Sequence, residues 1–126
     1  MLIRKVLLVD DDPDIRSIGS LSLRNIGKWQ VVVAESGVAA IQAIAQEKPD
    51  LVLLDVMMPG LDGPATLVRI QALAAQTVPP VIFMTAKTDP SELQRLVALG
   101  AKGAISKPFN PLLLLKQIRQ ILDHES

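Results

Sequence analysis

The sequence predicts an α/β fold in which helices cover both faces of one five-stranded parallel sheet. Five short apolar segments recur along the chain, separated by stretches in which apolar residues repeat at helical spacing. The segment LVLL at 51–54 has no polar alternation, which is typical of a strand buried on both faces of a parallel sheet. This alternation of strands and helices indicates consecutive βαβ units. The expected strands are 3–9, 29–33, 51–54, 81–84 and 103–106.

The first two helices have clear start and stop signals. Gly27 is placed to end the first helix, which is expected to turn one face toward the sheet. That face holds Ile15, Ile18, Gly19, Ser22 and Ile26. Ser36 is placed to cap the second helix, and Pro49 stops it. The repeating apolar positions of the second helix are Val38, Ile41 and Ile44 with Ala45.

The third and fourth helices each contain a proline where a helix tolerates one. Pro64 falls in the first turn of the third helix. The apolar positions of that helix are Leu67, Ile70 and Leu73 with Ala74. In the stretch DPSELQRLVALG, Asp89 is the expected cap of the fourth helix, Pro90 its first residue and Gly100 its end.

The fifth helix is expected to open at Asn110-Pro111 and contains four consecutive leucines. One face can accommodate Leu112, Leu114, Leu115, Ile118 and Leu122. Leu113 then points away from the core, as Leu21 does on the first helix.

Length and composition narrow the function classes. The 126 residues suffice for one hydrophobic core, so we expect a single domain over 1–126 with no output domain. The 13 basic and 13 acidic residues cancel, which indicates no basic face for nucleic acid. The absence of cysteine excludes disulfides and thiolate metal sites. No apolar run approaches the roughly 18 to 20 residues of a membrane span, and no signal peptide is indicated. We therefore expect a soluble, cytoplasmic protein that binds neither nucleic acid directly nor a membrane.

Polar residues stand at the carboxyl ends of four of the five expected strands. The first strand ends in Asp10, Asp11 and Asp12, the third in Asp55, the fourth in Thr85 and the fifth in Lys107. In a flavodoxin-like order 2-1-3-4-5, these four strands are contiguous, and ligands bind beyond their carboxyl ends. We therefore expect these side chains to converge on one crevice.

This mixture of side chains favours phosphoryl chemistry with a metal. Clustered carboxylates repel one another and need a cation, and a few hard oxygen ligands suit Mg²⁺. Lys107 and the Thr85 hydroxyl suit phosphoryl oxygens. A carboxylate such as Asp55 can attack phosphorus and form an aspartyl phosphate.

With these motifs in place, the whole chain resembles the response-regulator receiver domain of two-component signalling. VLLVDDD carries the acidic pair, and LVLLDVMMPGLDG carries the phosphoacceptor strand with its loop. FMTAK supplies the hydroxyl, and GAISKPF supplies the lysine followed by proline. The resemblance implies a phosphorylatable switch that catalyses only its own phosphorylation and dephosphorylation and then changes partner binding.

The resemblance also implies a role for each site residue. Asp10, Asp11, Asp55 and the backbone carbonyl of Met57 would hold Mg²⁺. Asp55 would accept the phosphoryl group from a sensor histidine kinase or a histidine phosphotransfer protein, and Thr85 and Lys107 would hold the phosphoryl oxygens. The Lys107–Pro108 bond resembles the cis peptide of the family.

Other positions bear on how phosphorylation is signalled and on how long the phosphoryl group stays on the protein. Receivers often carry a switching aromatic residue three positions before the lysine, where this chain has Ala104. In the family, residues corresponding to Met57 and Lys87 tune the access of water to the acyl phosphate. Receivers also often pair through their fourth and fifth helices, so the expected partners include a downstream protein or a homodimer in which Leu113 could take part.

Several acidic residues and the only histidine have simpler interpretations. Asp12 and Asp14 are better explained as a helix start, Asp62 as turn chemistry and His124 as a solvated helix end. Two other functions stay open. One is a receiver-like interaction module that is not phosphorylated. The other is a Mg²⁺-dependent aspartyl-phosphate phosphohydrolase, which is disfavoured because Met57 occupies the position of its usual second carboxylate and cannot move a proton.

Overall fold

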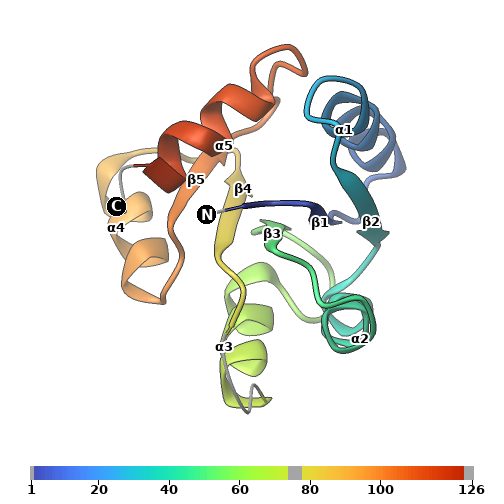
Figure 1. The fold of residues 1–126 in the computed structure, drawn as a ribbon. Helices are drawn as coiled ribbons and strands as arrows, with labels where there is room; N and C mark the ends of the chain where they lie inside the picture. Colours follow the sequence, from blue (N-terminus) through green and yellow to red (C-terminus); the bar gives the residue numbers. More distant parts are fainter. Residues whose placement is uncertain (1, 74–77, 124–126) are drawn as a thin grey trace.

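The computed structural model describes residues 2–73 and 78–123, and its sheet has five parallel strands in the order β2-β1-β3-β4-β5 (Figure 1). The strands are β1 Lys5–Val9, β2 Gln30–Ala34, β3 Leu51–Asp55, β4 Val81–Thr85 and β5 Gly103–Ser106. The helices are α1 Pro13–Asn25, α2 Gly37–Glu47, α3 Gly63–Leu73, α4 Pro90–Ala98 and α5 Leu114–Asp123. The predicted fold class and strand order are confirmed.

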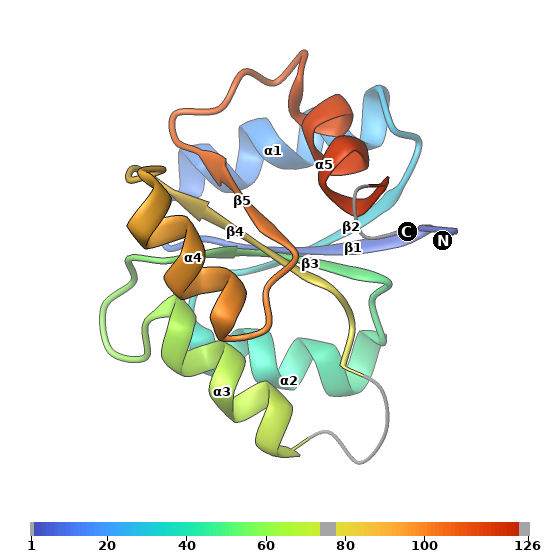
Figure 2. The same cartoon turned by 90° about the vertical axis from the view of Figure 1, so that its left-hand side faces the viewer.

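Helices cover both faces of the sheet, and each face has its own apolar core. Figure 2 shows α1 and α5 on one face and α2 and α3 on the other, with α4 beside α3. Leu23 of α1 and Ile118 of α5 pack against Leu8 on the first face. Leu67 of α3 and Leu96 of α4 pack with Phe83 of β4 on the second face. Among the strands, β3 and β4 are buried throughout, as expected for a sheet that is covered on both sides.

Most of the predicted helix starts are confirmed by their capping bonds. The Ser36 hydroxyl accepts from the Ala39 N–H at 3.1 Å, and the Asp89 carboxylate caps α4 with Pro90 as its first residue. Asp12 caps α1, in agreement with its interpretation as a helix start. None of the helices in the described part of the chain combines the length and apolar character that a membrane span requires.

The predicted inward face of α1 is wrong in part. Ile18 and Ile26 are 46% and 45% exposed, while Leu23 is fully buried. The reason is a close approach of helix and strand at Gly19, where an added Cβ would lie 2.7 Å from Leu8 Cδ2. This contact aligns Gly19 and Leu23 with the sheet and rotates Ile18 and Ile26 toward solvent.

The start of α5 also differs from the prediction. The Asn110 side chain accepts from the Leu112 N–H at 2.9 Å, which closes a turn, and the helix begins only at Leu114. Leu112 is therefore 76% exposed and not part of the inward face. Leu115 and Ile118 are buried and Leu113 is 46% exposed, both as predicted.

Smaller differences occur in α2 and α3. Ala40 is fully buried against the sheet, whereas Val38 is 56% exposed. Leu67 and Ile70 are buried as predicted, but Leu73 is 68% exposed, and Ala74 lies outside the described residues.

The segment between β5 and α5 is attached to α1. The Ser22 hydroxyl donates to the Pro111 carbonyl. The Phe109 ring packs against the first apolar core, and an added Cβ at Gly19 would lie 3.4 Å from Phe109 Cζ. The loop that begins with Lys107 is therefore held on the same helix that follows β1.

Gly63 brings α3 against the end of β3. Its N–H donates to the Val56 carbonyl at 2.9 Å, and an added Cβ would lie 2.3 Å from the Asp55 carbonyl oxygen. The strand that presents Asp55 therefore leaves no room for a side chain at this position.

We predict that Gly63→Ala lowers the free energy of unfolding by about 1 to 3 kcal/mol, because backbone must shift to make room for the methyl group. Urea unfolding followed by circular dichroism measures the change. Ala72→Ser, which adds one atom on the exposed side of the same helix, is the control and should stay within about 0.5 kcal/mol of the parent. Equal stability of Gly63→Ala and the parent would contradict the contact.

Candidate functional site

The candidate site lies at the carboxyl ends of the four contiguous strands β1, β3, β4 and β5. Asp10 follows β1, and Asp55 and Thr85 are the last residues of β3 and β4. Lys107 follows β5, and its N–H donates to the Thr85 carbonyl at 2.8 Å. The parallel order of the strands therefore brings residues from distant parts of the sequence to one edge.

Three carboxylates form the acidic part of the site. One oxygen from each of Asp10, Asp11 and Asp55 lies within 4.8 Å of the others. Asp10 and Asp55 are 0% and 3% exposed, and Asp11 is exposed. Hard oxygen ligands at this spacing, with one of them open to solvent, fit a Mg²⁺ ion that keeps several waters.

Lys107 bridges the two buried carboxylates. Its Nζ lies 2.9 Å from Asp10 Oδ2 and 3.2 Å from Asp55 Oδ1. Burial alone would lower the pKa of Lys107, but the hydrogen bond to Asp10 and the charges of both carboxylates outweigh it and raise the pKa. The ammonium group therefore stays charged and partly neutralises the acids.

Asp55 has an unusual protonation equilibrium. Burial and the nearby charge of Asp10 raise its pKa to about 6, although Lys107 and the Met57 N–H act in the opposite direction. The Met57 N–H lies 3.4 Å from Asp55 Oδ1. Without a metal, Asp55 therefore loses its proton only as the pH rises through about 6.

Asp10 is fixed by contacts that sequence reasoning did not identify. Its Oδ1 accepts from the Asp12 N–H at 2.9 Å, and its carbonyl accepts from Arg16 Nη1 at 2.8 Å. Arg16 lies one turn into α1, and no local sequence motif predicts that its side chain bonds the residue that follows β1.

Thr85 is 4% exposed, and its Oγ1 accepts from the Lys87 N–H at 3.0 Å. Because that bond uses a lone pair, the hydroxyl proton is left available for a ligand. Met57 and Lys87 come two residues after Asp55 and Thr85; the Met57 side chain is 78% exposed, and the Lys87 side chain is exposed too.

The remaining predicted positions have simple structural outcomes. The Lys107–Pro108 peptide bond is cis, as the resemblance implied. Ala104 pairs in register with Phe83 and is partly buried against the second core. Asp62 accepts from the Ala65 N–H at 2.9 Å at the start of α3, in agreement with its interpretation as a turn residue. His124 lies outside the described residues.

Comparison with known proteins gives a consistent result. The family model for the response regulator receiver domain matches residues 6–119. The DNA-binding response regulator MtrA of Mycolicibacterium smegmatis is 34% identical over 116 residues, which cover 92% of this chain and 49% of MtrA. The probable transcriptional regulator ycf27 of Guillardia theta is 40% identical over 118 residues, or 94% and 45% of the two chains. The chain thus spans about half the length of these curated relatives.

Solved structures agree with the sequence relatives. The chemotaxis response regulator CheY4 of Vibrio cholerae superposes with a TM-score of 0.86 at 32% identity, covering 95% of this chain and 99% of CheY4. The BeF3-activated N-terminal receiver domain of RstA from Klebsiella pneumoniae has a TM-score of 0.76 at 35% identity, over 94% and 98% of the two chains.

We predict that Asp55→Asn stabilises the metal-free protein above pH 6. Because the folded-state pKa of Asp55 is raised to about 6, the native state binds its proton more tightly than the unfolded chain does. The stability that this bound proton contributes is present below about pH 4 and is lost as the pH rises through 6. The advantage of the variant should grow by on the order of 1 to 3 kcal/mol between pH 4 and pH 7.

Urea unfolding in the presence of a chelator at both pH values measures this difference. Asp62→Asn, which changes an exposed carboxylate, is the control and should stay within about 0.5 kcal/mol of the parent at both pH values. A pH-independent effect of Asp55→Asn would contradict the raised pKa.

Proposed function

Because the chain belongs to the response regulator receiver domain family, we propose that it is a phosphorylatable switch that accepts a phosphoryl group on Asp55. The observation that carries this proposal is the position of Asp55. It ends a buried central strand, shares a 4.8 Å cluster with Asp10 and Asp11, and lies 3.2 Å from Lys107. Few functions other than this one explain why a carboxylate is buried beside a second carboxylate.

The proposed step is an in-line displacement at phosphorus. An Asp55 carboxylate oxygen forms the new P–O bond while the P–N bond of a phosphohistidine breaks, and the histidine nitrogen keeps the electron pair. Asp10, Asp11, Asp55 and the Met57 carbonyl would hold Mg²⁺, which when bound neutralises charge on the carboxylates and the phosphoryl oxygens. The phosphodonor would be a sensor histidine kinase or a histidine phosphotransfer protein.

Lys107 and Thr85 would then hold the transferred group. Lys107 Nζ already lies within 3.2 Å of Asp55, so a short displacement brings it to a phosphoryl oxygen. The Thr85 hydroxyl has a free proton to donate to a second oxygen. Both groups are placed by strand ends, which limits the reorganisation that the transfer requires.

Phosphorylation would change the binding of a downstream partner or of a second copy of the chain. Leu93 and Val97 of α4 are 37% and 46% exposed, and Leu113 beside α5 is 46% exposed. These residues support pairing through helices 4 and 5. MtrA is a DNA-binding response regulator, but that description belongs to a protein about twice as long as the chain that matches it.

Two alternatives fit less well. A phosphohydrolase needs a second acid/base close to the nucleophile, and the side chain two residues after Asp55 is the exposed thioether of Met57. An interaction module that is not phosphorylated would have no need for two buried carboxylates bridged by a lysine, since burying charged groups destabilises the fold.

We predict that Mg²⁺ and acetyl phosphate add one phosphoryl group to the protein and none to Asp55→Asn. Intact-mass spectrometry measures the label, which should survive acid and be lost in base. Asp12→Asn is the matched control, because Asp12 caps α1 and an asparagine caps equally well, so this variant should be labelled like the parent.

Removal of Mg²⁺ with a chelator, or Asp11→Ala, should strongly reduce the label because one hard ligand is lost. Labelling of Asp55→Asn to the parental level would refute the phosphoacceptor assignment. Full labelling of Asp11→Ala at limiting Mg²⁺ would refute the ligand set alone.

We further predict that Met57→Asn shortens the lifetime of the phosphorylated form. Met57 provides no hydrogen bond to orient an attacking water, whereas an asparagine amide does, and the cationic Lys87 would hold a phosphoryl oxygen. Loss of one to two decades in lifetime corresponds to about 1.4 to 2.8 kcal/mol of barrier. Decay of the label after donor removal, at fixed Mg²⁺, gives the rates. Decay of the parent within seconds, or equal decay of both proteins, would show that water reaches phosphorus by another route.

A further inference from the structure

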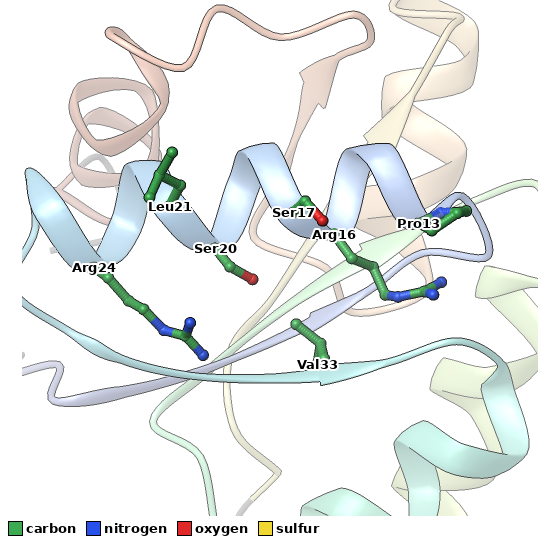
Figure 3. A pocket seen from close by; sticks show the side chains of 7 residues that line it. All are labelled: Pro13, Arg16, Ser17, Ser20, Leu21, Arg24 and Val33. Carbon is green, nitrogen blue, oxygen red and sulfur yellow. The ribbon is translucent and has the colours of Figure 1, made fainter.

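A groove of about 390 Å³ lies between α1 and the edge strand β2 (Figure 3), and none of the three clustered carboxylates lines it. Its walls combine two arginines, two serines and apolar carbon, and no acidic side chain lines it among the described residues. The residues used below are Arg16, Ser20, Arg24 and Val33. Figure 3 shows Arg16 and Arg24 reaching from α1 toward β2 on either side of Val33, with Ser20 between them.

The two guanidinium groups keep most of their hydrogen-bond donors free. Arg16 Nη1 donates to the Asp10 carbonyl at 2.8 Å, and Arg24 Nη2 donates to the Val31 carbonyl at 3.0 Å. Both acceptors are neutral, and no ion pair is formed by either arginine within the described ranges. Each guanidinium has five N–H groups, so several remain free for carboxylate ligands.

Ser20 lies on the same side of α1 as the two arginines. Its side chain is 7% exposed, and its hydroxyl oxygen has no hydrogen-bond partner in the described part of the chain. Buried hydroxyls are normally paired, and this one faces the space between α1 and β2 (Figure 3).

The Val31 carbonyl on this side of β2 accepts from Arg24, and the backbone of Val33 is open there. The Gln30 N–H donates to the Arg4 carbonyl at 2.8 Å, and the Asp10 N–H donates to the Ala34 carbonyl at 3.1 Å. Because alternate residues of a parallel strand bond the same neighbour, Val31 and Val33 direct their backbone groups away from β1. Within residues 2–73 and 78–123, β2 is the edge of the sheet, so no strand of these ranges pairs with them there.

From these features we propose that the α1–β2 groove binds an extended acidic segment of a partner protein, which pairs with β2 at Val33 and places carboxylates on Arg16 and Arg24. The arginines are eight residues apart, or about 12 Å along the helix. In an extended chain, side chains four residues apart lie on one face and about 13 Å from each other. One segment can therefore satisfy both charges while its backbone extends the sheet.

Fluorescence anisotropy with a labelled seven-residue peptide of alternating glutamate and valine tests the proposal. The same peptide with glutamine in place of glutamate should bind at least about tenfold more weakly. Arg24→Glu should also weaken binding of the acidic peptide by about tenfold or more. Arg69→Glu changes an exposed arginine of α3 on the opposite face and should leave binding unchanged.

Arg24→Gln covers the case in which a reversed charge harms folding, because it removes the charge without reversing it. It should weaken binding less than Arg24→Glu. Equal binding by the parent and both Arg24 variants, or no binding to the parent at millimolar peptide, would overturn the proposal.

Amide hydrogen exchange followed by NMR distinguishes a paired strand from a simple anion. The Val33 amide should exchange more slowly when the peptide is bound. If succinate displaces the peptide completely while Val33 exchange is unchanged, the groove binds small anions and the proposed strand pairing is refuted.

Discussion

The site depends on one buried arrangement of charge, in which Lys107 lies between Asp10 and Asp55 at 2.9 and 3.2 Å. Two carboxylates that are almost fully buried would repel each other across the end of the sheet, and burial removes the water that would otherwise screen them. The lysine compensates this cost while the site is free. Asp10 follows β1, Asp55 ends β3 and Lys107 follows β5, so the bridge also joins strands that are not all neighbours.

That bridge requires the strand order. Only because β1, β3, β4 and β5 are contiguous can the ends of four strands meet at one edge, while β2 remains outside the site. The same order leaves β2 as the sheet edge, with α1 above it. The site and the α1–β2 groove are therefore two consequences of one topology, and Arg16 contributes to both through its bond to the Asp10 carbonyl.

The sequence predicted the regular elements well because burial of a parallel sheet leaves a strong pattern: continuous apolar runs such as LVLL and helical repeats between them. It also identified the side chains that stand at the strand ends, although their chemical roles stay proposals. Local patterns could not predict the rotation of α1, which follows from the fit of Gly19 against Leu8. Nor could they predict the late start of α5, which depends on a side-chain bond of Asn110. The bond from Arg16 to the Asp10 carbonyl and the Ser20 hydroxyl without a partner in the described residues depend on tertiary packing, so local patterns do not predict them either.

The attachment of the β5–α5 loop to α1 has a mechanical consequence. The loop starts at Lys107, and two residues later the Phe109 ring packs beside Gly19, while the Pro111 carbonyl accepts from Ser22. A shift of Lys107 toward a phosphoryl group on Asp55 would therefore pull on α1 through the covalent chain and through the tight packing of this loop. Such a linkage needs no rotating side chain at Ala104. A displacement of the loop would therefore reach the first helix at Gly19 and Ser22, the two residues that hold the loop.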